Sequence, residues 1–188
     1  MPLGAARFGL LGGVADLGKL ELIETQTFSE VTSVTFSNIK EDIYNVHFLT
    51  ATIKDSATGS TGRGNKIQFY ESGVLETAGV YQYAEQFVQT NGGSGTVKST
   101  TGTFIYIGGN DPKPLTTNFY CYFYNLGDNQ KYSFLTHQLF EGFTGLGDYA
   151  HFGSGVLPQA STVDGIKYFM ATSDTFTGTI SLYGIAES

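Results

Sequence analysis

The sequence predicts an all-β protein, an antiparallel β-sandwich or jelly roll that follows an extended N-terminal arm. Aromatic residues make up 14% of the 188 residues although Trp is absent, and 25 Gly stand against 4 Pro, a composition typical of short strands with tight connections. Apolar and polar residues alternate in many short segments, as they do in half-buried strands. The length suits one domain, residues 19–188, after an arm of residues 1–18.

The arm is rich in glycine and has no strand period, yet it carries apolar side chains that would be costly to leave in water. The candidate partner-binding residues of this arm are Leu3, Phe8, Leu10, Leu11, Val14 and Leu17. Two interpretations stay open: an arm that orders on a partner or a neighbouring subunit, and a tail that packs on its own domain or frays. Its glycines and Asp16 interrupt the apolar stretch, so we expect neither an export signal nor membrane insertion.

The first part of the domain contains four segments with strand character, at residues 20–26, 31–37, 43–53 and 67–70. The second and third are separated by a predicted turn at residues 38–42. Residues 54–66 contain no apolar side chain larger than alanine, so we expect a solvated loop there.

Residues 78–89 fit two patterns, because apolar side chains recur at helical spacing and also alternate over residues 80–83. Glycine and threonine flank the segment without a capping box, which favours a strand over a helix. Residues 90–102 read as a second polar loop of glycine, serine and threonine. Residues 103–107 are apolar on both faces and predict a central strand.

The most aromatic strand is predicted at residues 118–125, after a turn at residues 108–114. Its alternation places Tyr120, Tyr122 and Tyr124 together on the face opposite Cys121. A row of tyrosines can form a contact between subunits or a platform on which sugars stack, because each ring is apolar with a polar tip. Packing between neighbouring strands of one sheet explains the row equally well.

The last third of the chain begins with a turn at residues 127–130 and a long strand at residues 131–141. Residues 142–158 are glycine-rich and read as an irregular, partly packed segment. Residues 164–185 alternate in two halves around a polar centre and predict a terminal hairpin, with Ile180 and Leu182 on its buried face.

The charge pattern restricts the possible partners. Charged residues amount to 14%, against about 25% in typical soluble proteins, so Ser, Thr, Asn, Gln and Tyr must cover the surface, which favours contact with another protein chain. The formal net charge of -7 argues against nucleic acid, whose binding requires clustered Lys and Arg.

The sequence shows no catalytic, cofactor or metal site, and we expect a protein that is not an enzyme. His47, His137 and His151 have no ligand partner at a convincing spacing, and His137 is predicted to be a hydrogen-bonded structural imidazole. The carboxylates are scattered along the chain without a recognisable pair. Cys121, the only cysteine, lies among aromatic residues and is predicted to be a small buried hydrophobe.

Several segments resemble small β-rich virion proteins of tailed phages, many from aquatic and cyanobacterial hosts. The ending GTISLYGI (178–185), after IKYFM and an SDTFTG turn, is similar to their terminal strands. LELIETQTFSEVTSVTFSNI (20–39) resembles their first two strands, and YNVHFLTATI (44–53) resembles the third.

The resemblance implies a non-enzymatic structural protein that is assembled in the host cytoplasm and resides in the virion as a homo-oligomer, with a trimer favoured. A tail-fibre or tail-appendage protein anchored by its N-terminal arm to other virion proteins is the first expectation. A capsid decoration or cement protein is the close alternative. A carbohydrate-binding β-sandwich, which could recognise a host-surface glycan, is the third. No cofactor and no catalytic residue come with the resemblance.

Overall fold

The computed structural model describes residues 19–55, 64–109, 116–142, 147–170 and 175–186, and within them it contains thirteen strands and no helix. The predicted all-β class is therefore confirmed, as is strand rather than helix for residues 81–89. The arm, with its six candidate binding residues, lies outside the described part. The strands are β1 (Leu20–Val31), β2 (Ser33–Phe36), β3 (Val46–Asp55), β4 (Asn65–Glu71), β5 (Val74–Leu75), β6 (Tyr81–Gln89), β7 (Ser94–Gly102), β8 (Ile105–Gly108), β9 (Thr116–Tyr124), β10 (Tyr132–Gly142), β11 (Tyr149–Ala160), β12 (Val163–Met170) and β13 (Phe176–Ile185).

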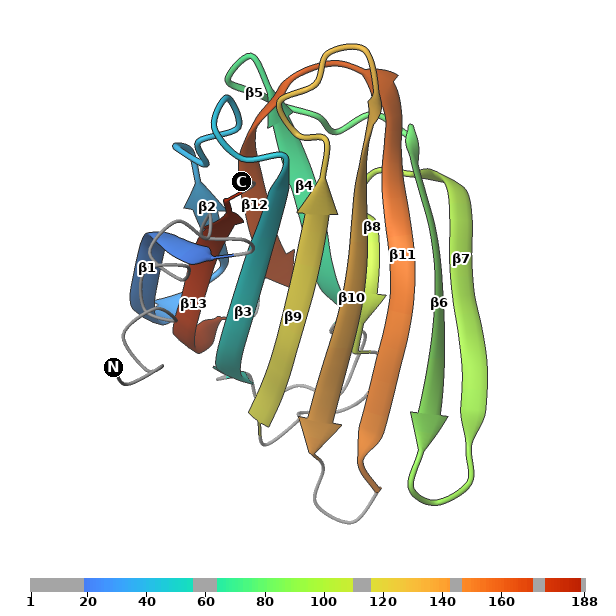
Figure 1. The fold of residues 1–188 in the computed structure, drawn as a ribbon. Helices are drawn as coiled ribbons and strands as arrows, with labels where there is room; N and C mark the ends of the chain where they lie inside the picture. The colour runs from blue at the N-terminus through green and yellow to red at the C-terminus, as the bar shows by residue number, and fades with distance from the viewer. Residues whose placement is uncertain (1–18, 56–63, 110–115, 143–146, 171–174, 187–188) are drawn as a thin grey trace, which may run out of the picture.

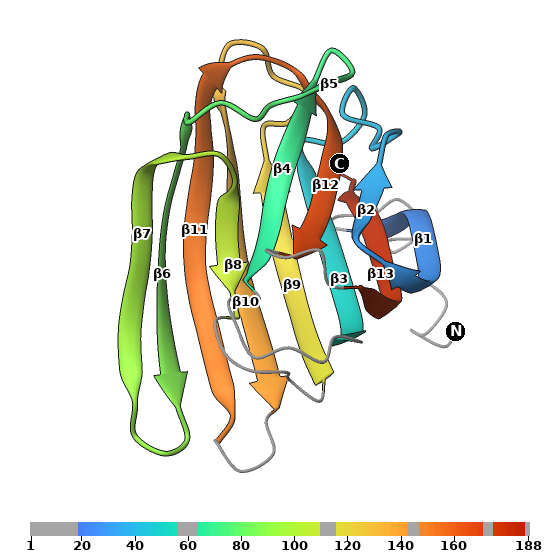
Figure 2. The ribbon, with the colours of Figure 1, turned by 180° about the vertical axis from the view of Figure 1, so that it is seen from behind.

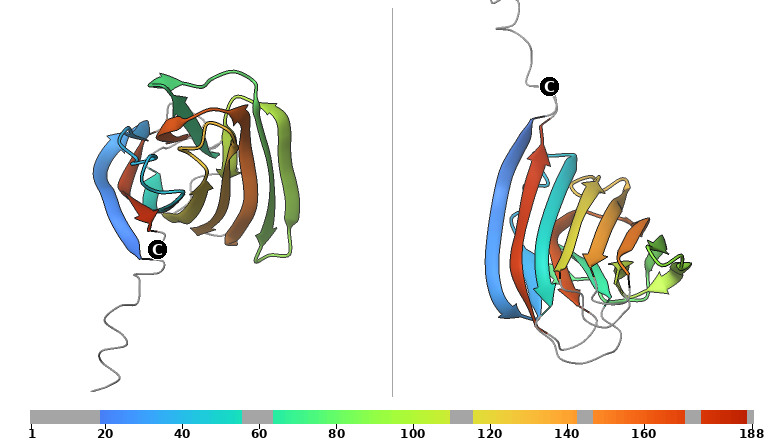
Figure 3. Two further views of the ribbon diagram at one scale, coloured as in Figure 1. Left: turned by 45° about the horizontal axis from the view of Figure 1, so that its top comes forward. Right: turned by 90° about the horizontal axis from the view of Figure 1, so that it is seen from below.

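Two antiparallel sheets form a sandwich (Figure 1). The large sheet has eight strands in the order β1-β13-β3-β9-β10-β11-β6-β7, and the small sheet has five, with β2-β12-β4-β5 in a row and β8 paired to β4. Seen from behind, the small sheet covers the middle of the large one, while β7 lies beyond it (Figure 2). Figure 3 shows the large sheet as one curved layer with β1 and β7 at its ends.

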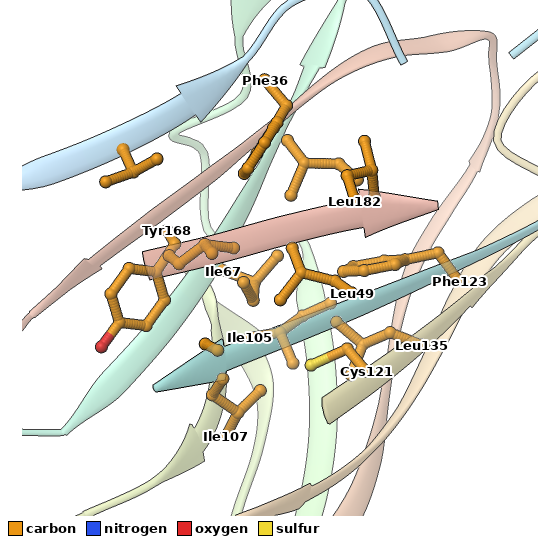
Figure 4. Packing of buried hydrophobic residues seen from close by; sticks show 14 of the residues in the cluster. Phe36, Leu49, Ile67, Ile105, Ile107, Cys121, Phe123, Leu135, Tyr168 and Leu182 are labelled. Carbon is orange, nitrogen blue, oxygen red and sulfur yellow. The ribbon is translucent and has the colours of Figure 1, made fainter. Parts of the chain in front are cut away.

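The core lies between the sheets because each strand of the large sheet turns alternate side chains inward. Leu49 and Leu182 of the large sheet are fully buried, as are Ile67 and Tyr168 of the small sheet, and Figure 4 shows these side chains gathered between the layers. Aromatic contacts cross the interface as well: the rings of Phe119 and Tyr168 stack with centroids 5.2 Å apart. The apolar residues that recur at every second position of the sequence are therefore the ones that are buried.

The prediction of a terminal hairpin is wrong, because its two strands do not pair with each other. The prediction of which side chains of these strands face the core is confirmed. β12 pairs with β2 and β4 in the small sheet, whereas β13 pairs with β1 and β3 in the large sheet. Ile180 and Leu182 are buried as expected, and Tyr168 of β12 meets Phe176 of β13 edge to face across the core, at 5.1 Å. Alternation fixes which side of a strand faces the core, but it does not select the neighbouring strand.

Two segments predicted to lack regular structure are strands. Residues 142–158, expected to be irregular, contain most of β11, in which Gly155 leaves room for β8: a Cβ there would lie 2.3 Å from the Ile105 side chain. Residues 90–102, expected to be a loop, contain β7. Because β7 pairs only with β6 among the described strands and lies at the sheet edge, its hydroxyl-rich composition is compatible with solvent.

The segment predicted as a central strand is short and lies off the main path of its sheet. β8 pairs with β4 alone among the described strands, but all four of its residues are buried. They are buried because β8 also packs against β6, β10 and β11 of the large sheet. Contact between layers, rather than two flanking strands, thus explains why residues 105–108 are apolar on both faces.

The core position of Leu182 yields a stability prediction. We expect Leu182→Asp to lower the free energy of unfolding by several kcal/mol, because it places an unpaired carboxylate between the sheets. Chemical denaturation measures this change. Ser181→Asp is the matched control on the outward side of β13, where the change removes one exposed hydrogen bond to Thr25 and should cost about 1 kcal/mol or less. Equal losses in both variants would contradict the observed facing of β13.

Candidate functional site

The outward side of the large sheet carries aromatic side chains and few charges. From Val46 to Thr52 of β3, and along β9, β10 and β11, no described outward position carries a charged residue. The aromatic members on these strands are Phe48, Tyr120, Tyr122, Tyr124, Tyr132, Phe134, Phe140 and Phe152. An uncharged face of this kind has the composition of a binding surface.

The three tyrosines of the predicted row do lie side by side on the outward side of β9, where each is half-buried. Phe48 of β3 packs against Tyr122 with ring centroids 4.7 Å apart and against Tyr120 at 6.1 Å. The Tyr120 hydroxyl donates to the Gln138 side chain. Contacts within the sheet therefore occupy part of this row, and they hold its rings in fixed positions on the surface.

Three exposed apolar side chains on this side form a compact group. Phe140 of β10 is 46% exposed, Phe152 of β11 is 42% exposed and Val88 of β6 is 43% exposed. Ala150 pairs with Phe140 on one side and with Val88 on the other, and Phe152 is the next outward residue of the same strand, so Phe152 lies diagonally across from both. We call Phe140, Phe152 and Val88 the apolar patch.

A second candidate site is buried between the layers, where two histidines and two glutamates come together from three strands of the large sheet. His151 Nδ1 of β11 lies 3.0 Å from Glu85 Oε1 of β6, and His151 Nε2 lies 3.7 Å from Glu141 Oε2 of β10. His137 of β10 lies close to them, over Gly153. The four side chains are at most 5% exposed. We call His137, His151, Glu85 and Glu141 the buried cluster.

The small sheet contributes hydrogen bonds to the buried cluster. Asn65 of β4 donates through Nδ2 to Glu141 Oε1 at 3.2 Å and accepts at Oδ1 from the Tyr168 hydroxyl of β12. Thr117 of β9 also donates to Glu141 Oε1, at 3.4 Å. A continuous chain of polar contacts thus joins the two sheets through the core.

Burial shifts two pKa values in the cluster in opposite directions. It raises the pKa of Glu141 to about 7, although His151 and the hydrogen bonds from Asn65 and Thr117 favour the ionised form. It lowers the pKa of His137 to about 3, with a smaller contribution from His151. Glu141 also contributes to the lining of a surface pocket of about 400 Å³.

The predicted role of His137 is corrected by its surroundings. Neither of its ring nitrogens has a hydrogen-bond partner among the described residues, whereas the imidazoles of His47 and His151 are hydrogen-bonded, with His47 Nε2 2.8 Å from the Ile39 carbonyl oxygen. Sequence reasoning missed the cluster because its members come from separate strands. One signal was present in the sequence. His137 and Glu141 occupy the same alternate positions of the strand as Leu135 and Leu139, which places them on its buried face.

The remaining expectations concern cysteine, metals and membranes. Cys121 is buried as predicted, and burial raises the pKa of its thiol. Within the described ranges, no group of three or more His, Cys, Asp or Glu side chains is placed to hold a metal ion. No described segment forms a helix of the length and hydropathy needed to cross a bilayer.

Comparison with known proteins finds no matching family model and no matching curated protein. Among solved structures, the chain is similar to a fructofuranosidase from Schwanniomyces occidentalis complexed with fructose, at 9% identity and a TM-score of 0.38 over 89% of this chain and 34% of that one. It is also similar to the GH43 protein BlXynB from Bacillus licheniformis, at 9% identity and a TM-score of 0.33 over 77% of this chain and 28% of that one. The chain thus spans about a third of the length of these structures.

A third similar structure is the CBM2 module of the evolved Dit of Lactobacillus casei BL23 phage J-1, at 12% identity and a TM-score of 0.27 over 83% of this chain and 69% of that one. The prediction that the chain is not an enzyme is corrected by the comparison, because the first two similar structures are a fructofuranosidase and a GH43 protein. At these TM-scores the similarity does not establish an activity either, and the prediction is withdrawn.

The opposite pKa shifts predict opposite effects of pH on two variants. Between pH 6.5 and 3 the unfolded chain binds a proton at His137 that the folded chain does not, so acidification destabilises the fold through this residue. His137→Leu should therefore raise stability at pH 5 relative to pH 7 by about 2 kcal/mol. Urea unfolding of both proteins at the two pH values measures the difference.

Glu141 provides the reciprocal control. Between pH 4.5 and 7 the folded chain holds a proton on Glu141 that the unfolded chain releases, so stability through this residue falls as the pH rises. Glu141→Gln should therefore raise stability at pH 7 relative to pH 5, also by about 2 kcal/mol. Shifts of the same sign in the two variants would contradict the assigned pKa directions.

Proposed function

We propose that the chain is a structural component of a tailed-phage virion, in the tail fibre or another tail appendage, and that it docks against other chains through the apolar patch. The observation that carries the proposal is the exposure of Phe140, Phe152 and Val88 on adjoining strands, within a part of the sheet whose described outward residues on β10 and β11 are uncharged. Contiguous apolar surface without charge is typical of sites where protein chains meet.

The segments that resemble phage virion proteins also support this proposal. They lie far apart in the sequence, at residues 20–39, 44–53 and 178–185, but they form adjoining strands of one structure. β13 lies between β1 and β3 in the large sheet, and β2 follows β1 directly (Figure 1). The resemblance therefore covers a single structural unit at one end of the sandwich.

The occupant that we favour for the apolar patch is another copy of this chain, in a homotrimer. Identical subunits can bury the same surface in every copy, and a patch without charge avoids bringing like charges together in a protein of net charge -7. Other virion proteins would then contact the assembled oligomer.

Sedimentation of the purified chain tests this assembly. We expect an oligomer at micromolar concentration, and we expect Phe152→Asp to shift it to monomer because it places a charge in the apolar patch. Val74→Asp on β5 of the small sheet is the matched control, since Val74 is 69% exposed and lies outside the patch. A monomeric native chain, or equal dissociation by the two substitutions, would overturn the assembly role of the patch.

Labelled particles test the location in the virion and the predicted arm. Electron microscopy with an antibody against the chain should place the label on the tail, and label distributed over the capsid would support a decoration protein instead.

A chain without residues 1–18 should fold, since the strands from β1 onward are retained, but it should be absent from particles. Incorporation of the shortened chain at the native level would contradict the anchoring role of the arm.

A further inference from the structure

A groove with a volume of about 620 Å³ opens across β10, β11, β6 and β7, toward the opposite end of these strands from the apolar patch. Four strands contribute to its lining, so the groove runs across the sheet rather than along one strand. Its volume falls within the range of about 300–1,000 Å³ that is usual for small-molecule sites. The groove is thus large enough for an oligosaccharide and small enough to select among ligands.

Phe134 and Val156 contribute adjacent apolar side chains to the groove lining. Phe134 of β10 is 42% exposed, and Val156 of β11 is its direct partner in the strand pairing. Tyr124 of β9 pairs with Phe134 on the other side, and Gln82 of β6 pairs with Val156. These four residues form a row across four strands, about 14 Å long at the usual strand spacing. A chain of sugar rings could lie along this row with apolar ring faces against the aromatic side chains.

The polar part of the lining has unused hydrogen-bonding capacity. Gln82, Thr100 and Ser154 are exposed, and their side chains form no hydrogen bond with any described residue. Together they offer amide and hydroxyl groups that both donate and accept, which is the capacity needed to bind sugar hydroxyls. An apolar wall beside such groups is the usual composition of a site that orients a polar ligand.

Lys98 of β7 is the only charged residue of the lining. Its side chain is exposed and forms no ion pair or hydrogen bond with the described residues. A single cation at the groove of a protein with net charge -7 provides a local site for an anionic group. A ligand carboxylate could accept a charge-assisted hydrogen bond from the Lys98 ammonium group.

We infer that the groove binds an oligosaccharide that carries a carboxylate group, with Phe134 as the stacking surface and Lys98 as the partner of the carboxylate. This inference goes beyond the proposed place in the virion and does not depend on it. A peptide is less well matched, because extended peptides pair with an open strand edge, whereas this groove crosses strands that are already paired with each other.

Binding to two trisaccharides tests the inference with the purified full chain. Isothermal titration calorimetry should show that the trimer of galacturonic acid binds roughly tenfold more tightly than the neutral trimer of galactose at low salt. Lys98→Met should remove this preference and leave the affinity for the neutral trimer unchanged. Phe134→Ala should weaken binding of both trimers, by up to roughly tenfold. Thermal unfolding verifies that each variant is folded.

Leu22→Ala is the control, because Leu22 of β1 is an exposed apolar residue of the same sheet, 60% exposed, and lies outside both the groove and the apolar patch. It should leave both affinities unchanged. The inference is overturned by failure of the native chain to bind either trimer at millimolar concentration, by an acidic preference that survives Lys98→Met, or by equal losses in Phe134→Ala and Leu22→Ala. Loss of particle incorporation has no bearing on these readouts, so the two proposals can fail separately.

Discussion

The polar chain that runs from Tyr168 through Asn65 and Glu141 to His151 and Glu85 is the contact on which the arrangement of the two sheets depends. Each member comes from a different strand, so all five strands must hold their register for these buried groups to meet. Buried polar groups that lose their partners are costly, which makes shifted pairings unfavourable. The apolar core surrounds this polar chain, and its hydrogen bonds favour the register in which the buried groups meet their partners.

The difference in size between the two sheets determines what the outside of the molecule can do. The small sheet covers the middle of the large one, so β7 lies past the covered region (Figure 2). The outward side of the large sheet is thereby a broad surface held by a rigid core. The apolar patch and the groove lie toward opposite ends of the same strands, which allows contact with a protein chain and with a ligand without competition for the same side chains.

Alternation in the sequence was enough to predict the all-β class, most strands and the buried sides of β12 and β13, because burial follows the period of two. It could not predict that β12 and β13 belong to different sheets, since either pairing satisfies the same pattern. It also missed β7 and β11, whose serine, threonine and glycine content reflects an exposed edge and close approach to Ile105. The tyrosine row was visible in the sequence, whereas the buried cluster depends on strand order that no local pattern encodes.

The edge position of β7 has a consequence for aggregation. An edge strand presents unpaired backbone groups to its surroundings, and neighbouring molecules at high density could add to it in an unlimited series. Lys98 and the hydroxyl side chains of β7 are hydrated, and they oppose such pairing because it would remove water from them. The composition that hides β7 from recognition as a strand thus also disfavours edge-to-edge aggregation.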